Sequence, residues 1–192
     1  MPSPSKREVV VDTALKLFKT KGINSTGVEE IIKTANISKK TLYNHFKSKE
    51  ELVLATLRKD DEIGRNALMK FAEQASDDPI QKIMAIFDFY KMWFESPTFK
   101  GCLFINSAAE IAEDSNSLKH VCTEHKILIA KYIEKLAEQS HVKNPKELAK
   151  RLNLLLEGAI VYAFVVKDDQ SALRAKEMAN ITIAHHFSSE LS

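Results

Sequence analysis

The side chains best suited to chemistry in this sequence lie in one short segment and are almost all hydrogen-bond donors. No acidic residue occurs between Glu30 and Glu50. Within that stretch Leu42 and Phe46 are four positions apart, which predicts the buried face of a helix over residues 39–46. The outer face then carries Lys39, Lys40, Thr41, Tyr43, Asn44 and His45. Such a donor face suits phosphate oxygens and base edges, so the segment indicates contact with nucleic acid.

The other reactive side chains do not combine into a catalytic or metal site. No nucleophile, base and orienting residue can be assembled, and Ser107 near Glu110 fits ordinary helix surface. His120, Cys122 and His125 have a spacing on one helix that does not point all three at one ion. The five glycines are scattered and form no nucleotide-binding loop. We therefore expect no enzymatic activity, no metal and no cofactor.

The positive charge is concentrated at one end of the chain. Residues 1–59 hold twelve Lys or Arg and six Asp or Glu, whereas the whole chain of 192 residues has a formal net charge of only +2. A polyanionic partner explains this distribution, although a solvated lysine face would look similar. The chain begins without the apolar core of a secretory signal, and it has two cysteines. The apolar stretch 154–166 is too short to span a bilayer, so we expect a cytoplasmic protein without a membrane segment.

The elements that must position the donor face are predicted to be helices. Only five Gly and five Pro occur, and apolar residues recur at helical spacing, so the fold class is all-α. Three short N-terminal helices are expected over 5–21, 28–35 and 39–46, with turns at Gly22 and Asn36 and with Thr26 or Gly27 as the cap of the second. Two helices joined by a short turn place the second in the major groove of DNA.

The same segment carries a family resemblance. It reads GINSTGVEEIIKTANISKKTLYNHFKSKEEL over residues 22–52, and it resembles the helix-turn-helix of the TetR/AcrR family of bacterial transcriptional regulators. The most specific positions are Ser38, Thr41, Leu42, Tyr43, His45, Phe46, Lys49, Glu50 and Leu52. The resemblance extends over about residues 8–57. It implies a homodimer that binds a palindromic operator on double-stranded DNA and is released by a small-molecule effector.

The resemblance also assigns roles to individual residues. Tyr43, His45 and Lys49 match family positions that grip phosphates, and Thr41 matches one that touches backbone or base. Lys39 and Lys40 stand where base reading varies most, and Lys40 suits a guanine or a phosphate equally. Gly27 stands where many family members have a hydroxyl residue near a phosphate. In this chain Thr26 or a backbone N–H at the helix start would make that phosphate contact. The candidate DNA-binding residues are Thr26, Gly27, Lys39, Lys40, Thr41, Tyr43, Asn44, His45 and Lys49.

Aromatic residues cluster in the C-terminal part of the chain. Seven of the fifteen lie between Phe87 and Phe104. They suit either the lining of an apolar ligand cavity or an ordinary core. If the cluster lines a cavity for a mostly apolar effector, the candidate ligand-binding residues are Phe87, Tyr90, Trp93, Phe94, Cys102 and Phe104. Cys102 and Cys122 suit small buried residues, with a sensing thiol as the alternative.

The last two helices are expected over 145–166 and 171–188. The first is apolar nearly all round, so it needs cover from its own domain and from a second molecule. The family resemblance likewise implies a homodimer through the last two helices. We divide the chain into a helix-turn-helix DNA-binding domain over 1–50 and a helical ligand-binding and dimerisation domain over 51–192.

The sequence thus predicts a ligand-responsive transcriptional regulator, a repressor in the form that the resemblance suggests. Two alternatives stay open. One is a dimeric DNA-binding regulator that responds to no ligand. The other, of a different class, is a helical protein that binds a small molecule and no DNA.

Overall fold

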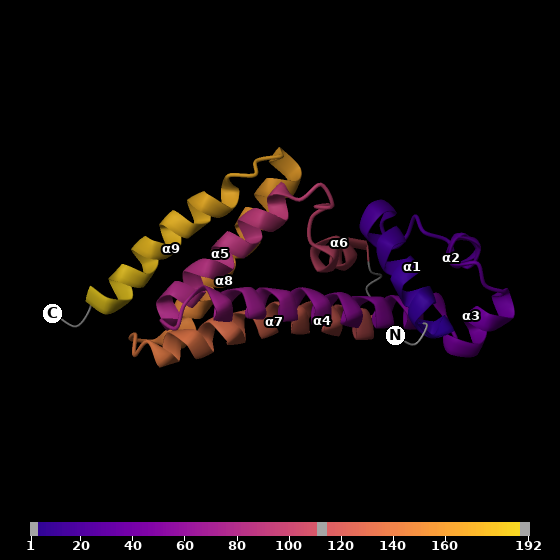
Figure 1. Ribbon diagram of the computed structural model, residues 1–192, viewed down its shortest axis with the longest axis horizontal. Helices are drawn as coiled ribbons and strands as arrows, with labels where there is room; N and C mark the ends of the chain where they lie inside the picture. The colour runs from indigo at the N-terminus through magenta and orange to yellow at the C-terminus, as the bar shows by residue number, and fades with distance from the viewer. Residues whose placement is uncertain (1–3, 111–114, 189–192) are drawn as a thin grey trace. The chain divides into compact units, whose positions relative to one another are not determined.

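A computed structural model describes residues 4–110 and 115–188, and within these ranges it contains nine α-helices and no strand. The helices are α1 (Lys6–Lys21), α2 (Val28–Ala35), α3 (Lys39–His45), α4 (Lys49–Ala75), α5 (Pro79–Glu95), α6 (Leu103–Glu110), α7 (Asn116–Gln139), α8 (Pro145–Val166) and α9 (Ser171–Ser188) (Figure 1). The predicted all-α class is confirmed. The sequence also predicts an amphipathic helix over 103–112, of which residues 111 and 112 lie outside the described part of the chain.

Local sequence signals fix most helix ends. Ser5 caps α1, where its hydroxyl accepts a hydrogen bond from the backbone N–H of Glu8. Gly22 ends the same helix with a positive φ of 87°, and Asn36 ends α2 in the left-handed region with a φ of 51°. Asp78 caps α5 directly before Pro79. The predicted helix boundaries in the N-terminal part are therefore confirmed to within a residue.

The chain forms two compact units, and the cut falls inside α4. The first unit comprises residues 1–63 and 102–125, and the second comprises 64–101 and 126–192, as far as these residues are described. Helix α6 and the beginning of α7 thus belong with the N-terminal helices. The division between residues 50 and 51 separates a DNA-binding domain from a ligand-binding and dimerisation domain by function, and it stays a prediction.

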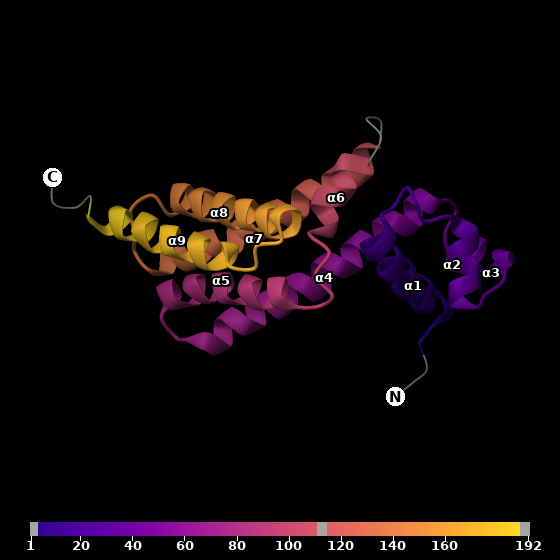
Figure 2. The same ribbon diagram turned by 90° about the horizontal axis from the view of Figure 1, so that it is seen from above.

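In the first unit, α1, α2 and α3 pack against one another (Figure 2). Their shared core contains Val10, Ala14, Phe18, Ile31, Leu42 and Phe46, all of them buried. Because α3 has only seven residues, it has little stability of its own. The packing of Leu42 and Phe46 against the other helices therefore sets which face of α3 is exposed.

In the second unit, α5, α8 and α9 lie side by side (Figures 1 and 2). An ion pair joins Lys176 on α9 to Asp88 on α5 at 2.6 Å. Seven exposed apolar residues lie on one side of α8 or of α9: Leu154, Val161, Tyr162, Val165, Val166, Met178 and Ile181. We call these seven residues the α8–α9 apolar face. None of the described helices is long and apolar enough to cross a membrane.

Candidate nucleic-acid interface

The outer face of α3 presents the side chains that the sequence singled out. Ser38 caps the helix by accepting a hydrogen bond from the backbone N–H of Thr41 at 3.0 Å. The side chain of Thr41 is half-buried, and its hydroxyl lies 2.8 Å from that of Ser38. The exposed residues are Lys39, Lys40, Tyr43, Asn44 and His45. The structure thus brings these donors together on one face, and their contacts with DNA stay predictions.

Lys39 has a partner within the helix-turn-helix. Its ammonium group donates a hydrogen bond to the Glu29 carboxylate on α2 at 2.8 Å. This hydrogen bond and the negative charge of Glu29 raise the pKa of Lys39 above its usual value. Lys40, by contrast, forms no ion pair within the described ranges. The two neighbouring lysines therefore differ, because Lys39 is held in place and Lys40 is not.

Lys49 connects the start of α4 to the loop between α1 and α2. Its ammonium group donates to the backbone carbonyl of Ile23 at 2.7 Å. One of its three N–H donors is used by this bond, and the other two remain for a phosphate. Lys49 can therefore bind DNA and also fix the loop that leads into α2.

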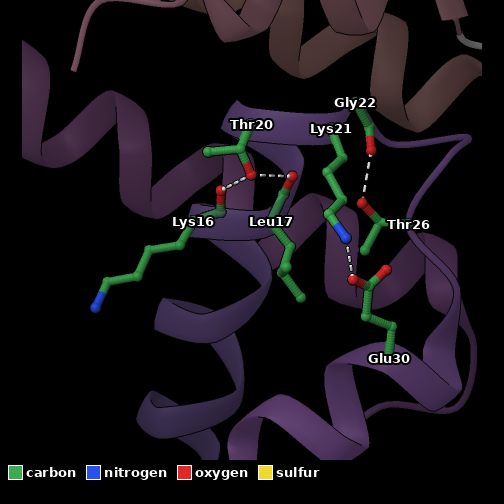
Figure 3. Close-up of polar contacts among 7 residues, drawn as sticks. All are labelled: Lys16, Leu17, Thr20, Lys21, Gly22, Thr26 and Glu30. Carbon is green, nitrogen blue, oxygen red and sulfur yellow. Dashed lines mark hydrogen bonds and ion pairs between the residues drawn. The ribbon is translucent and has the colours of Figure 1, made fainter. Parts of the chain in front are cut away.

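Thr26 and Gly27 have different environments. Thr26 is fully buried, and its hydroxyl donates to the backbone carbonyl of Gly22 at 2.8 Å (Figure 3). The Thr26 hydroxyl therefore serves the turn. Gly27 is the exposed cap of α2, and no heavy atom lies within 4 Å of a Cβ placed on it. Of the two predicted alternatives, the geometry favours the backbone N–H groups at the start of α2 as the phosphate contact.

Two ion pairs join lysines near the end of α1 to other helices of the first unit. Lys21 at the end of α1 pairs with Glu30 on α2 (Figure 3). Lys19 pairs with Asp60 on α4. These lysines, which lie in the basic end of the chain, are neutralised within the protein and contribute less to a phosphate-binding surface than the charge count suggests.

The last residue of α6 contacts the loop between α1 and α2. The backbone N–H of Asn24 donates to the Glu110 carboxylate at 2.7 Å, and the Asn24 side-chain amide donates to the Glu110 backbone carbonyl at 3.0 Å. A Cβ at Gly22 would lie only 2.8 Å from the same carboxylate. The expectation that Ser107 and Glu110 are ordinary helix surface is wrong, because Ser107 is fully buried and Glu110 holds this loop. The positive φ of Gly22 was predictable, but the neighbour that needs the space was not.

The candidate ligand residues are divided between the two units. Phe87, Tyr90, Trp93 and Phe94 belong to the second unit, where the Tyr90 ring makes edge contacts with Trp93 and Phe94 at centroid distances of 5.8 and 6.1 Å. Cys102 and Phe104 belong to the first unit. As a ligand-binding set these six residues stay a prediction.

Phe104 instead has a close polar neighbour. Its ring stacks on His125 at a centroid distance of 3.7 Å, and His125 Nδ1 lies 2.8 Å from a carboxylate oxygen of Asp61. Cys102 and Cys122 are both buried and form no disulfide. In the described residues, no group of three His, Cys, Asp or Glu side chains is placed to hold a metal ion.

Two family models match the chain. Residues 10–56 match the bacterial regulatory proteins of the tetR family, and residues 79–179 match the tetracyclin repressor-like C-terminal domain. The second match alone covers more than half of the chain.

Individual proteins resemble the chain over most of its length. The HTH-type transcriptional regulator YxaF of Bacillus subtilis is 26% identical over 181 residues, which cover 92% of this chain and 94% of YxaF. The HTH-type transcriptional repressor NemR of Escherichia coli is 25% identical over 114 residues, which cover 59% of this chain and 57% of NemR. The crystal structure of SCO4454, a TetR-family transcriptional regulator from Streptomyces coelicolor, has a TM-score of 0.86 at 23% identity and covers 94% of this chain and 95% of its own. This last likeness shows the fold.

Proposed function

The chain belongs to the TetR family of bacterial regulatory proteins, and from this premise we propose that it is a repressor that binds a palindromic operator as a homodimer and is released by a small, mostly apolar effector. TetR-family members are DNA-binding transcriptional regulators and not enzymes, and they function as dimers. The operator, the effector, the interface and the sign of regulation are the parts that we propose.

The exposed donor face of α3 carries the proposal. Five consecutive or nearly consecutive polar side chains are exposed there, and Leu42 and Phe46 are buried on the other side of the helix. Lys40 and Tyr43 project donors that suit a base edge and a phosphate, respectively. In a two-fold symmetric dimer, two such helices would enter successive major grooves about 34–36 Å apart, or at a multiple of that spacing.

The α8–α9 apolar face supports the proposed dimer. Leu154 is 73% exposed, Val165 68% and Ile181 63%, and all three lie on the last two helices. Several large apolar side chains exposed together are unfavourable in water and are typical of a protein interface. A second copy of the chain would cover both helices with the same residues.

The contact of α6 with the α1–α2 loop supports ligand response. Glu110 links α6 to Asn24, a few residues from the start of α2, so a shift of α6 would be transmitted to the helix-turn-helix. Within the described residues, Ser107 Oγ on α6 and Asn153 Oδ1 on α8 are buried and have no hydrogen-bond partner. A bound polar group could satisfy either atom. The effector would then favour dimers whose α3 helices no longer match the operator spacing.

Repression is proposed because the relative NemR of Escherichia coli is a transcriptional repressor. The runner-up function is a dimeric DNA-binding regulator that responds to no ligand. Thermal unfolding with candidate effectors separates the two, because a ligand that binds only the folded state raises its melting temperature. A regulator of chromosomal DNA works in the cytoplasm, and we include that location in the proposal.

The testing experiment is binding of the purified protein to the DNA upstream of its own gene, at two salt concentrations and with excess nonspecific competitor. Binding that resists the competitor would support a sequence-specific regulator that controls its own gene. Binding that the competitor removes would leave only a nonspecific basic surface or an operator elsewhere.

A further inference from the structure

Arg7, in the first turn of α1, lies beside the C-terminal end of α3. Its guanidinium carbon is 5.2 Å from the centroid of the Phe46 ring. Phe46 is buried and directly follows His45, the last residue of α3, whose ring lies 6.4 Å from the same Phe46 ring. Residues 7 and 45 are thus brought to the same aromatic ring, although they are far apart in the sequence.

The charge of Arg7 is not neutralised by an ion pair in the described part of the chain. Two other cations of α1 and α4 differ in this respect, because Lys19 pairs with Asp60 and Lys59 pairs with Asp12. The acidic residues beside Arg7 have other partners. Glu8 accepts hydrogen bonds from the N-terminal cap residue of α1, and Glu51 accepts one from the backbone N–H of Lys47 at 2.6 Å.

A guanidinium group near an aromatic ring keeps its hydrogen-bonding capacity. The ring attracts the cation through its π face, and the N–H groups lie in the guanidinium plane, where they can form a fork to an oxyanion. The Arg7 side chain is exposed, so these donors reach solvent. The contact with Phe46 also restricts the side chain before binding, which lowers the entropy lost when a phosphate is bound.

We propose that Arg7 is a further phosphate-binding residue of the DNA interface, positioned by Phe46 beside His45 at the C-terminal end of α3. This inference rests on the proposed DNA binding. The C-terminal end of a helix in the major groove can lie against the sugar–phosphate backbone, as it does in the homeodomain variant of the helix-turn-helix. Arg7 comes from α1, so it extends the interface beyond the helix-turn-helix segment.

The test uses the full-length protein and a fluorescein-labelled 30-base-pair duplex of mixed sequence, with fluorescence anisotropy measured across a salt series. Arg7→Met removes the charge and keeps an apolar contact with Phe46, and Arg7→Lys restores the charge. Lys16→Met is the matched control. Lys16 is an exposed cation of the same helix, has no ion pair among the described residues, and lies nine positions away, on the opposite side of α1.

Each lost phosphate contact lowers the slope of log K against log salt by about 0.9, so Arg7→Met should lower it by about 1.8 in a dimer. At 0.1 M salt the affinity should fall at least roughly tenfold. Arg7→Lys should recover most of the slope, and Lys16→Met should leave it unchanged. Circular dichroism is the measurement that checks whether each variant remains folded.

An unchanged slope in Arg7→Met, or an equal loss in Lys16→Met, would overturn the role of Arg7 and leave the proposed function standing. Absence of salt-dependent DNA binding by the wild-type protein would overturn both.

Discussion

The exposed face of α3 and the α8–α9 apolar face have opposite chemistry. The first consists of donors such as Lys40 and Asn44, and the second of aliphatic and aromatic side chains such as Leu154 and Val165. Hydrogen-bond donors are well solvated in water, whereas exposed apolar area costs about 25 cal/mol per Å². This difference fits the two partners that we propose. A face of solvated donors tolerates repeated release of DNA, whereas an exposed apolar face favours a lasting contact with a second copy of the chain.

The largest expected effect comes from a charge in the α8–α9 apolar face. Val165→Asp would bury an unpaired carboxylate in each protomer of the dimer, so we expect dimerisation to weaken at least about 100-fold. Operator affinity should fall with it, because two half-sites would no longer be bound together. Analytical ultracentrifugation measures the first effect and anisotropy the second.

The control for this variant is Met92→Asp. Met92 is 56% exposed and apolar, but it lies on α5. It should leave the protein dimeric. A dimeric Val165→Asp protein, or a monomeric Met92→Asp protein, would show that the interface lies elsewhere.

The next effect concerns Lys49, which contacts the loop in the structure and for which we also propose a phosphate contact. Lys49→Met should lower the salt slope by about 1.8 per dimer and weaken binding to all sequences alike. It should also lower the free energy of unfolding by about 1 kcal/mol, because the carbonyl of Ile23 loses its donor. Urea unfolding and salt-dependent anisotropy separate the two roles. If only the stability changes, Lys49 holds the loop and does not touch phosphate.

A smaller effect is expected at the link between α6 and the helix-turn-helix. Glu110→Ala removes the acceptor of the Asn24 backbone N–H, at a cost of about 1 kcal/mol. Amide exchange at Asn24 should accelerate about fivefold. Asn24→Ala keeps that N–H and loses only the 3.0 Å side-chain bond, so its amide should stay more protected. Equal protection in the two variants would mean that Glu110 does not hold the loop.

The smallest effect is expected from the exposed pair of Lys39 and Glu29. Glu29→Gln removes a negative charge beside the DNA-binding face, so nonspecific DNA should bind about threefold more tightly at 0.1 M salt. The melting temperature should hardly change, because both side chains are well exposed. Competition between specific and nonspecific duplexes measures the change. Weaker nonspecific binding would show that Glu29 is needed to hold Lys39 in place.

Much of the fold was predictable because its signals are local. Caps at Ser5 and Asp78 and positive-φ turns at Gly22 and Asn36 lie within a few residues of the helix ends that they set. The donor face of α3 was predictable for the same reason, since two apolar residues four positions apart define its buried side.

The contacts that organise the site were not predictable in this way. The bonds between Asn24 and Glu110 join residues 86 positions apart, and that between Lys49 and Ile23 joins residues 26 apart. The burial of Thr26 depends on the path of the loop around it, which no helical periodicity describes. The sequence therefore predicts which side chains face outward on a helix, but not which of them are engaged by another element.

Selection of binding sites from random double-stranded DNA tests the central claim most directly. We predict enrichment of a two-fold symmetric sequence whose half-site centres are about one helical turn apart, or a multiple of it. Lys40→Ala should change the preferred bases within each half-site. If no sequence is enriched, the assignment of α3 as the element that reads DNA is contradicted. The assignment is also contradicted if the Lys40→Ala protein and a matching Tyr43→Phe protein both enrich the same sequence as the wild type.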